Sequence, residues 1–159
     1  MSAISMDTTD HSTEIAQALE EMKNLGFQQR IDGRFAAVFT TSDEIACILK
    51  ESYVPIDEFK KVFVQMVEIA RGGSYHKFIF DKRALTTFHQ PTMEWYFLHW
   101  KREMLQLGVS KHRKILPNLR WFEQAVAIAR NPLLEQFSAE ERSQLDIKYC
   151  NTLEEAHQS

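Results

Sequence analysis

The chain has 159 residues, 44% of them apolar and 26% charged, and this predicts a single globular domain. Its net charge of −3 gives the chain as a whole no attraction to nucleic acid or to an anionic membrane. No apolar run approaches the roughly 18–20 residues that cross a bilayer, so no membrane partner is expected. Cys47 and Cys150 lie far apart and outside any metal-ligand spacing, which favours a reducing, cytoplasmic compartment.

The order of apolar and polar residues divides the chain into a tail, a helix and one domain. Residues 1–12 are polar and are expected to form a disordered tail. A short amphipathic helix is expected over 13–26, because apolar residues recur at helical spacing before Gly26. The remainder, 27–159, is expected to form the single α/β domain.

Strands and helices alternate within this domain. The runs Phe35–Thr41 and Glu44–Lys50 flank a polar turn and predict a hairpin. A helix with one apolar face is expected from Pro55 to Gly72. The other elements expected from periodicity and from flanking glycines and prolines are a short strand Phe27–Ile31, a strand His76–Phe80, a loop Asp81–Gln90, a helix Pro91–Leu107, a strand Lys111–Leu116, a helix Asn118–Arg130, a short helix Ser138–Ser143 and a strand Leu145–Cys150.

This alternation predicts a mixed sheet of four to five strands whose later strands are parallel and joined by right-handed crossovers. The strand Lys111–Leu116 departs from the apolar pattern of a buried parallel strand, because it begins with Lys-His-Arg-Lys. Four consecutive ionisable groups cost much free energy in a dry core. We therefore expect this strand either to be short and at a sheet edge, or to project its start as a basic surface.

Four segments follow one another from Phe35 to Ala156, and their letters are EIACILKESYVPIDEFKKVF, KFIFDKRALTTFHQPTMEW, LGVSKHRKILPN and LDIKYCNTLEEA. In this order and spacing they resemble STAS-like domains, which are related to anti-sigma factor antagonists. The closest likeness is to short stand-alone bacterial members of that family. The second segment is similar to the family's central strand with an Asp at its end, followed by a loop and a helix that opens with Pro.

The resemblance implies a cytoplasmic α/β domain with helices packed mainly on one face of the sheet, which regulates by binding and catalyses no reaction. In the family, phosphorylation of a Ser or Thr at the start of the second main helix controls binding to a kinase-type anti-sigma partner, since the phosphate adds nearly two negative charges there. That turn corresponds to 89–92, whose Gln and Pro cannot accept a phosphoryl group. Thr86, Thr87 and Thr92 are the candidate phosphoacceptors, and they could also hold an anion near the helix start.

Partner-binding residues are expected in the loop after the strand His76–Phe80 and on the helix that follows. The carboxyl end of such a strand is where α/β proteins commonly place their sites. Tyr96 and the aromatic residues on either side of it spread across more than half the circumference of a helix, so some aromatic surface is expected outside the core. The residues predicted to bind another protein, or a second copy of this chain in a homodimer, are Asp81, Arg83, Phe88, His89, Trp95, Tyr96 and Trp100.

The alternative is a carrier or sensor of a small apolar or anionic ligand, held between the aromatic helix and the sheet. A third, weaker alternative is an enzyme with a site formed by Asp81, Arg83 and His89. The sequence has no Walker loop, G-x-G-x-x-G or G-x-S-x-G. His89, Glu94 and His99 lack the order of a helical metal site. No metal, cofactor or nucleic-acid partner is therefore expected.

Overall fold

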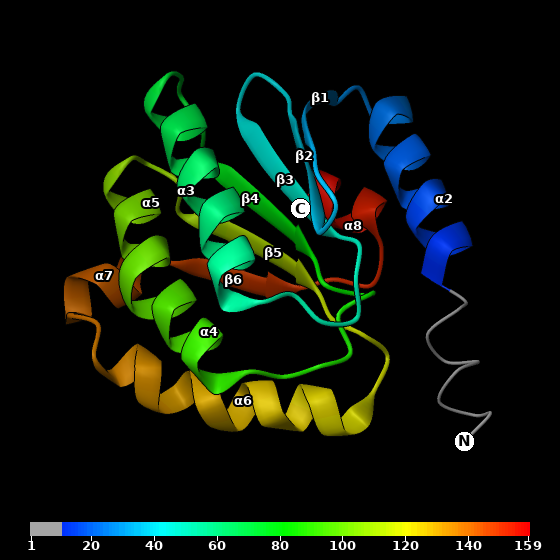
Figure 1. The fold of residues 1–159 in the computed structure, drawn as a ribbon. Helices are drawn as coiled ribbons and strands as arrows, with labels where there is room; N and C mark the ends of the chain where they lie inside the picture. The colour runs from blue at the N-terminus through cyan, green and yellow to red at the C-terminus, as the bar shows by residue number, and fades with distance from the viewer. Residues whose placement is uncertain (1–10) are drawn as a thin grey trace.

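In the computed structural model, which describes residues 11–159, six strands form one sheet in the order in which they occur in the chain (Figure 1). The first three strands pair antiparallel, and the third to sixth pair parallel. The predicted mixed sheet is confirmed, but the expected count of four to five strands is too low, because all six expected strands, the two short edge strands included, pair in one sheet. The strands are β1 Gln28–Asp32, β2 Ala36–Thr40, β3 Glu44–Leu49, β4 Lys77–Asp81, β5 Lys111–Ile115 and β6 Asp146–Tyr149.

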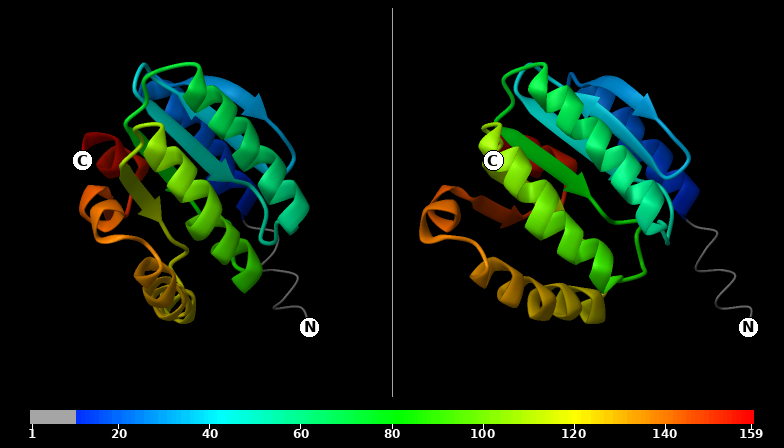
Figure 2. Two further views of the ribbon diagram at one scale, coloured as in Figure 1. Left: turned by 90° about the vertical axis from the view of Figure 1, so that its left-hand side faces the viewer. Right: turned by 60° about the vertical axis from the view of Figure 1, so that its left-hand side comes forward.

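The helices cover both faces of this sheet, with the larger layer on one face (Figure 2). That layer contains α3 Ile56–Arg71, the continuous run α4 Gln90–Trp95, η1 Tyr96–Lys101 and α5 Arg102–Gln106, and α6 Arg120–Glu135, with α7 Ala139–Gln144 beside α5. The other face carries α2 His11–Asn24 and α8 Leu153–Gln158. Of the tail predicted over 1–12, residues 1–10 lie outside the described residues, whereas 11–12 already belong to α2.

Successive side chains of β4 point to opposite faces of the sheet and pack into two separate cores. Phe78 and Phe80 point to the larger layer of helices, whereas Ile79 points to α2 and α8. α3 supplies the apolar stripe that covers this part of the larger core, including Phe63, whose ring lies 4.9 Å from that of Trp100. Trp100 also donates a hydrogen bond from Nε1 to the carbonyl of Phe63 at 2.7 Å, which joins η1 to α3.

The aromatic helix contains a π-helical stretch, η1, between α4 and α5. A π-helix bonds residue i to i+5, and the Lys101 amine accordingly lies 3.3 Å from the Tyr96 hydroxyl. Tyr96, Phe97 and Trp100 are all buried, because α3 and α6 pack on either side of η1. The expectation that aromatic surface lies outside the core is therefore wrong for Tyr96 and Trp100, whereas Phe88 and Trp95 are half-buried.

The basic strand β5 lies inside the sheet, between β4 and β6, so the expected edge position is wrong. Its residues from His112 to Ile115 are buried, and no basic surface is formed by its start beyond Lys111. Alternation sends Arg113 to one face, where its Nη2 lies 3.0 Å from the Asp146 carboxylate. His112 and Lys114 point to the other face, under η1.

The two tryptophans Trp100 and Trp121 provide a test of this packing. Trp100→Ala is expected to lower the free energy of unfolding by about 3–5 kcal/mol, because it leaves a cavity in the larger core. Trp121 is 51% exposed, so Trp121→Ala should change it by about 0.5 kcal/mol or less. Urea unfolding followed by circular dichroism measures both values. Equal losses would contradict the core position of Trp100.

Candidate functional site

Asp81 and Arg83 form a closed pair at the carboxyl end of β4. The buried Asp81 carboxylate accepts hydrogen bonds from Arg83 at its backbone N (3.0 Å), Nε (3.0 Å) and Nη2 (2.7 Å). The carboxylate thus accepts three hydrogen bonds, two of them from the guanidinium in a bidentate pair. The two residues line a shallow hollow with Ile15, Ala18 and other residues of the α2 face. They therefore lie next to each other, but the Asp81 side chain points away from the aromatic helix, and His89 lies in the lining of another cavity.

The loop over 82–89 closes a small cavity against the larger core. The cavity has a volume of about 40 Å³ and is lined by residues of α3, β4, η1 and α6 as well as the loop. Thr87 and His89 are exposed at this loop, and the His89 Nδ1 lies 2.7 Å from the Thr92 hydroxyl. The structure thus brings together five of the sequence-predicted site residues, Thr87, Phe88, His89, Thr92 and Tyr96, in the lining of one cavity.

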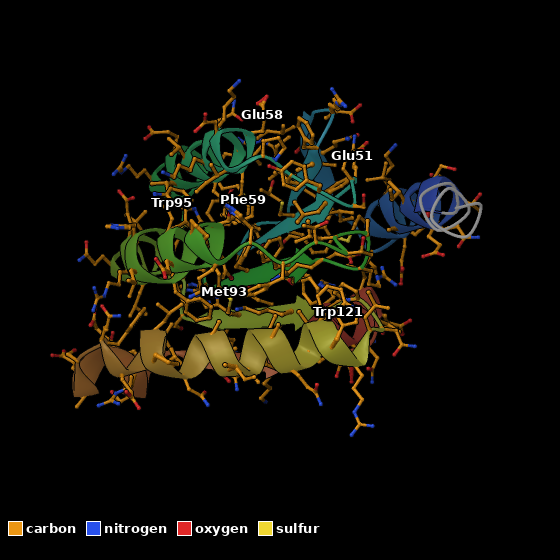
Figure 3. The ribbon with its side chains drawn as sticks, turned by 60° about the horizontal axis from the view of Figure 1, so that its bottom comes forward. Glu51, Glu58, Phe59, Met93, Trp95 and Trp121 are labelled. Carbon is orange, nitrogen blue, oxygen red and sulfur yellow. The ribbon has the colours of Figure 1, made fainter. Side chains whose placement is uncertain are left out.

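The other predicted site residues lie elsewhere. Trp95 packs edge-on against Phe59 with ring centroids 6.2 Å apart, between α3 and α4 at the surface (Figure 3). Trp100 is buried beneath η1 and does not line the cavity. Thr86 donates its backbone N–H to the Ser52 carbonyl and lines a larger groove on the other side of the loop.

That groove has a volume of about 1120 Å³ and lies at the carboxyl ends of β4, β5 and β6. Arg130 crosses one side of it and donates a hydrogen bond to the Tyr149 hydroxyl at 2.8 Å. Both acidic and basic side chains line the groove, so it has no marked preference for one sign of charge. The charged residues in its lining are Glu14, Arg83, Glu123 and Arg130.

Lys82 is a charged residue of the cavity lining that the sequence interpretation did not select as a site residue. Its side chain is 9% exposed, and its amine lies over the rings of Phe80 at 5.4 Å and Phe122 at 5.5 Å. Within 11–159 it makes no ion pair and no side-chain hydrogen bond. Burial lowers the pKa of the Lys82 amine to about 8. The cavity therefore contains an amine that is partly neutral near physiological pH.

Two more lysines and a histidine extend this site beneath η1. The Lys101 amine lies 3.2 Å from the Nδ1 of His112, and it lies 4.8 Å from the centre of the Tyr96 ring. The Lys114 amine lies over the same Tyr96 ring at 4.8 Å. All three side chains are essentially inaccessible to water. We call Lys82, Lys101, His112 and Lys114 the amine cluster.

No carboxylate enters the amine cluster in the described part of the chain. Burial, and then repulsion among the lysines themselves, holds the pKa of Lys114 well below its ordinary value. Burial lowers the pKa of Lys101 and of His112 in the same way, and the His112 Nε2 atom has no hydrogen-bond partner among the described residues. A buried charge is normally paired, so these groups are neutral unless a negative group binds beside them.

One sequence signal could have identified the amine cluster. Residues two apart on a strand share a face, so Lys82 continues the row of Phe78 and Phe80. By the same rule His112 and Lys114 share one face of β5. The sequence interpretation considered the charged residues as consecutive runs, and a run does not show which residues lie on which face of the sheet.

Within the described residues, no three His, Cys, Asp or Glu side chains gather as a metal site would require. None of the described helices is both long and apolar enough to cross a membrane. Comparisons with protein-family models, curated proteins and solved structures found no match to this chain.

The lowered pKa values predict how stability changes with pH. A lysine that is neutral when folded and protonated when unfolded makes unfolding take up a proton, so stability rises with pH between the lowered pKa and the ordinary value of 10.5. In this window the free energy of unfolding of the wild type should rise by roughly 1 kcal/mol per pH unit relative to that of Lys114→Met.

Urea unfolding at about pH 7.5 and about pH 9 measures this difference. Above that range Cys47 and Tyr96 act in the opposite direction, because burial raises their pKa values and unfolding then releases a proton. Lys61 is exposed, so Lys61→Met is the matched control. Its free energy of unfolding should depend on pH as that of the wild type does. A parallel profile for Lys114→Met would contradict the burial of a neutral amine at this position.

Proposed function

We propose that the protein is a non-enzymatic binding module that takes a small anionic ligand in the cavity beneath the 82–89 loop. The observation that carries the proposal is the acid-free amine cluster. A buried ammonium costs several kcal/mol unless it is paired. Lys82, with a pKa of about 8, is still mostly protonated at neutral pH and has no anion beside it. A ligand carboxylate or phosphate would supply that missing charge.

The cavity limits the size of the group that enters. A water molecule needs roughly 10–15 Å³ of such volume, so about 40 Å³ accommodates a group the size of a carboxylate. The walls are mostly aromatic, which suits a short apolar tail next to the anion. Exposed Thr87 and His89 stand where a longer ligand would leave the cavity. The Lys82 amine next to these walls favours an anionic ligand over a purely apolar one.

The regulatory, STAS-like character of the module belongs to the same proposal. Support for it comes from the sequential strand order and from the crossover helices α3, α4–α5 and α6, which all lie on one face of the sheet (Figure 2). On this proposal the protein is a bacterial, cytoplasmic regulator that responds to its ligand and catalyses no reaction.

Ligand binding is tested with defined probes. Hexanoate and inorganic phosphate, each added to the purified 159-residue chain, should raise the unfolding free energy, by about 2.7 kcal/mol at one hundred times the Kd. Thermal unfolding and calorimetry measure the effect. Lys82→Met should abolish it, whereas Lys61→Met on the exposed side of α3 should leave it unchanged. Equal stabilisation of both variants, or none of the wild type, would contradict an anion site at Lys82.

A second candidate, binding of a protein or of a second copy of this chain, rests on Phe88 and Trp95. These two rings remain half-buried beside the exposed His89, so the loop and the start of the helix present aromatic surface to a partner. Light scattering should then show a dimer that Trp95→Ala converts to monomer, since exposed aromatic anchors carry much of a binding energy. Thr87→Ala, exposed on the same loop, is the control. A monomer at every concentration would exclude the homodimer.

A further inference from the structure

The Lys82 amine has the surroundings of a nucleophile rather than of a structural cation. Within the described residues it makes no hydrogen bond and no ion pair, and it lies over the faces of Phe80 and Phe122. Aromatic faces attract an ammonium only weakly compared with water or a carboxylate. Lys82 therefore has a larger share of neutral amine, which carries the free electron pair, than an exposed lysine has, and it lines a cavity that reaches the surface loop.

The neighbours of Lys82 would stabilise a negative charge at this position. Lys101 and Lys114 lie close enough for the Lys82 charge to lower their pKa values by repulsion. Both sit over the Tyr96 ring, which also lines the cavity. No described carboxylate enters the cluster. An anion formed on Lys82 would turn three mutually repelling amines into an attractive arrangement.

We propose that Lys82 binds carbon dioxide as a carbamate and thereby makes this site a carbon dioxide sensor. The electron pair of the neutral Nζ attacks the carbon of CO2, and an N–C bond forms while one C=O electron pair moves to oxygen. Nζ then releases a proton to water, which leaves Nζ–H bonded to a carboxylate. No oxidant, reductant or other reactant is needed.

The size and polarity of the cavity fit this reactant. Carbon dioxide is an uncharged molecule of three atoms, and a cavity of about 40 Å³ with aromatic walls admits it without moving the loop. The carboxylate that forms is the acid that the amine cluster lacks. Lys114 or Lys101 can then take up a proton, because a neighbouring negative charge raises the pKa of an amine.

The carbamate goes beyond the proposed anion binding, because it needs the cavity and the Lys82 amine but no external anion. Lys82→Arg separates the two. A guanidinium keeps the positive charge that attracts hexanoate, yet it stays protonated and cannot attack CO2. Loss of carbamate with retained hexanoate binding in this variant therefore supports both proposals. Loss of hexanoate binding in the wild type, with carbamate still formed, overturns the anion proposal alone.

The test uses the 159-residue chain at about pH 8 in ¹³C-labelled bicarbonate equilibrated with CO2. Carbamates are trapped as ethyl esters with triethyloxonium, and the modified lysines are located by peptide mass spectrometry. At this pH an amine with a pKa of about 8 has roughly a hundredfold more neutral form than an ordinary lysine. Labelling of Lys82 should exceed that of exposed Lys61 in the same sample by about tenfold or more.

Lys114→Met should lower the labelling of Lys82, because it removes a cation beside the product. Circular dichroism shows whether each variant is folded. If a variant does not fold, the comparison of Lys82 with Lys61 in the wild type still decides the outcome. Labelling of Lys82 that does not exceed that of Lys61 overturns the proposal. So does a Lys82 adduct whose mass is the same in unlabelled and in ¹³C-labelled bicarbonate, because its carbon then does not come from CO2.

Discussion

The position of β5 between β4 and β6 constrains much of this molecule. An internal parallel strand is covered on both faces, so the side chains from His112 to Ile115 must be buried whatever their charge. The two faces meet this constraint differently. On the side of α8, Arg113 reaches the Asp146 carboxylate and the Ser159 hydroxyl. Under η1 the Lys101 and Lys114 amines meet aromatic rings, the Tyr96 hydroxyl, each other and His112, and no carboxylate among the described residues.

The sequence was sufficient for the order of the elements, and particular residues show why. Pro55, the glycines at 72 and 108, and the alternation in the hairpin mark helix ends and strands through local backbone chemistry, which needs no knowledge of the fold. Gly108, for example, has a φ of 97°, a conformation that stops the helix before β5. A short strand was expected at β1, but its place in the sheet was missed, because alternate residues of β1 are exposed and the strand is stabilised mainly by pairing with β2.

The candidate site was harder to predict, because its decisive feature is that no described carboxylate pairs with the Lys82 amine. Asp81, Lys82 and Arg83 are consecutive charges that look alike in a sequence, but alternation separates them. The structure closes Asp81 and Arg83 into one ion pair and leaves Lys82 on the opposite face. Likewise, the extra residue per turn of η1 places Lys101 over Tyr96, an arrangement that no periodicity of the sequence indicates.

The amine cluster opposes the stability of the protein, and this bears on its role. Replacing buried ionisable groups by apolar residues of similar size is often neutral or stabilising, since desolvation outweighs the attraction gained. Lys114 and Lys101 have no acid to offset their desolvation, whereas Lys77, buried on the other face, donates to the carbonyls of Ala156 and His157 and lies 3.7 Å from Glu44. One buried lysine is thus satisfied by the fold itself. Lys82 has no such partner among the described residues, and a negative group that enters the cavity beside it, or forms on it, would provide one.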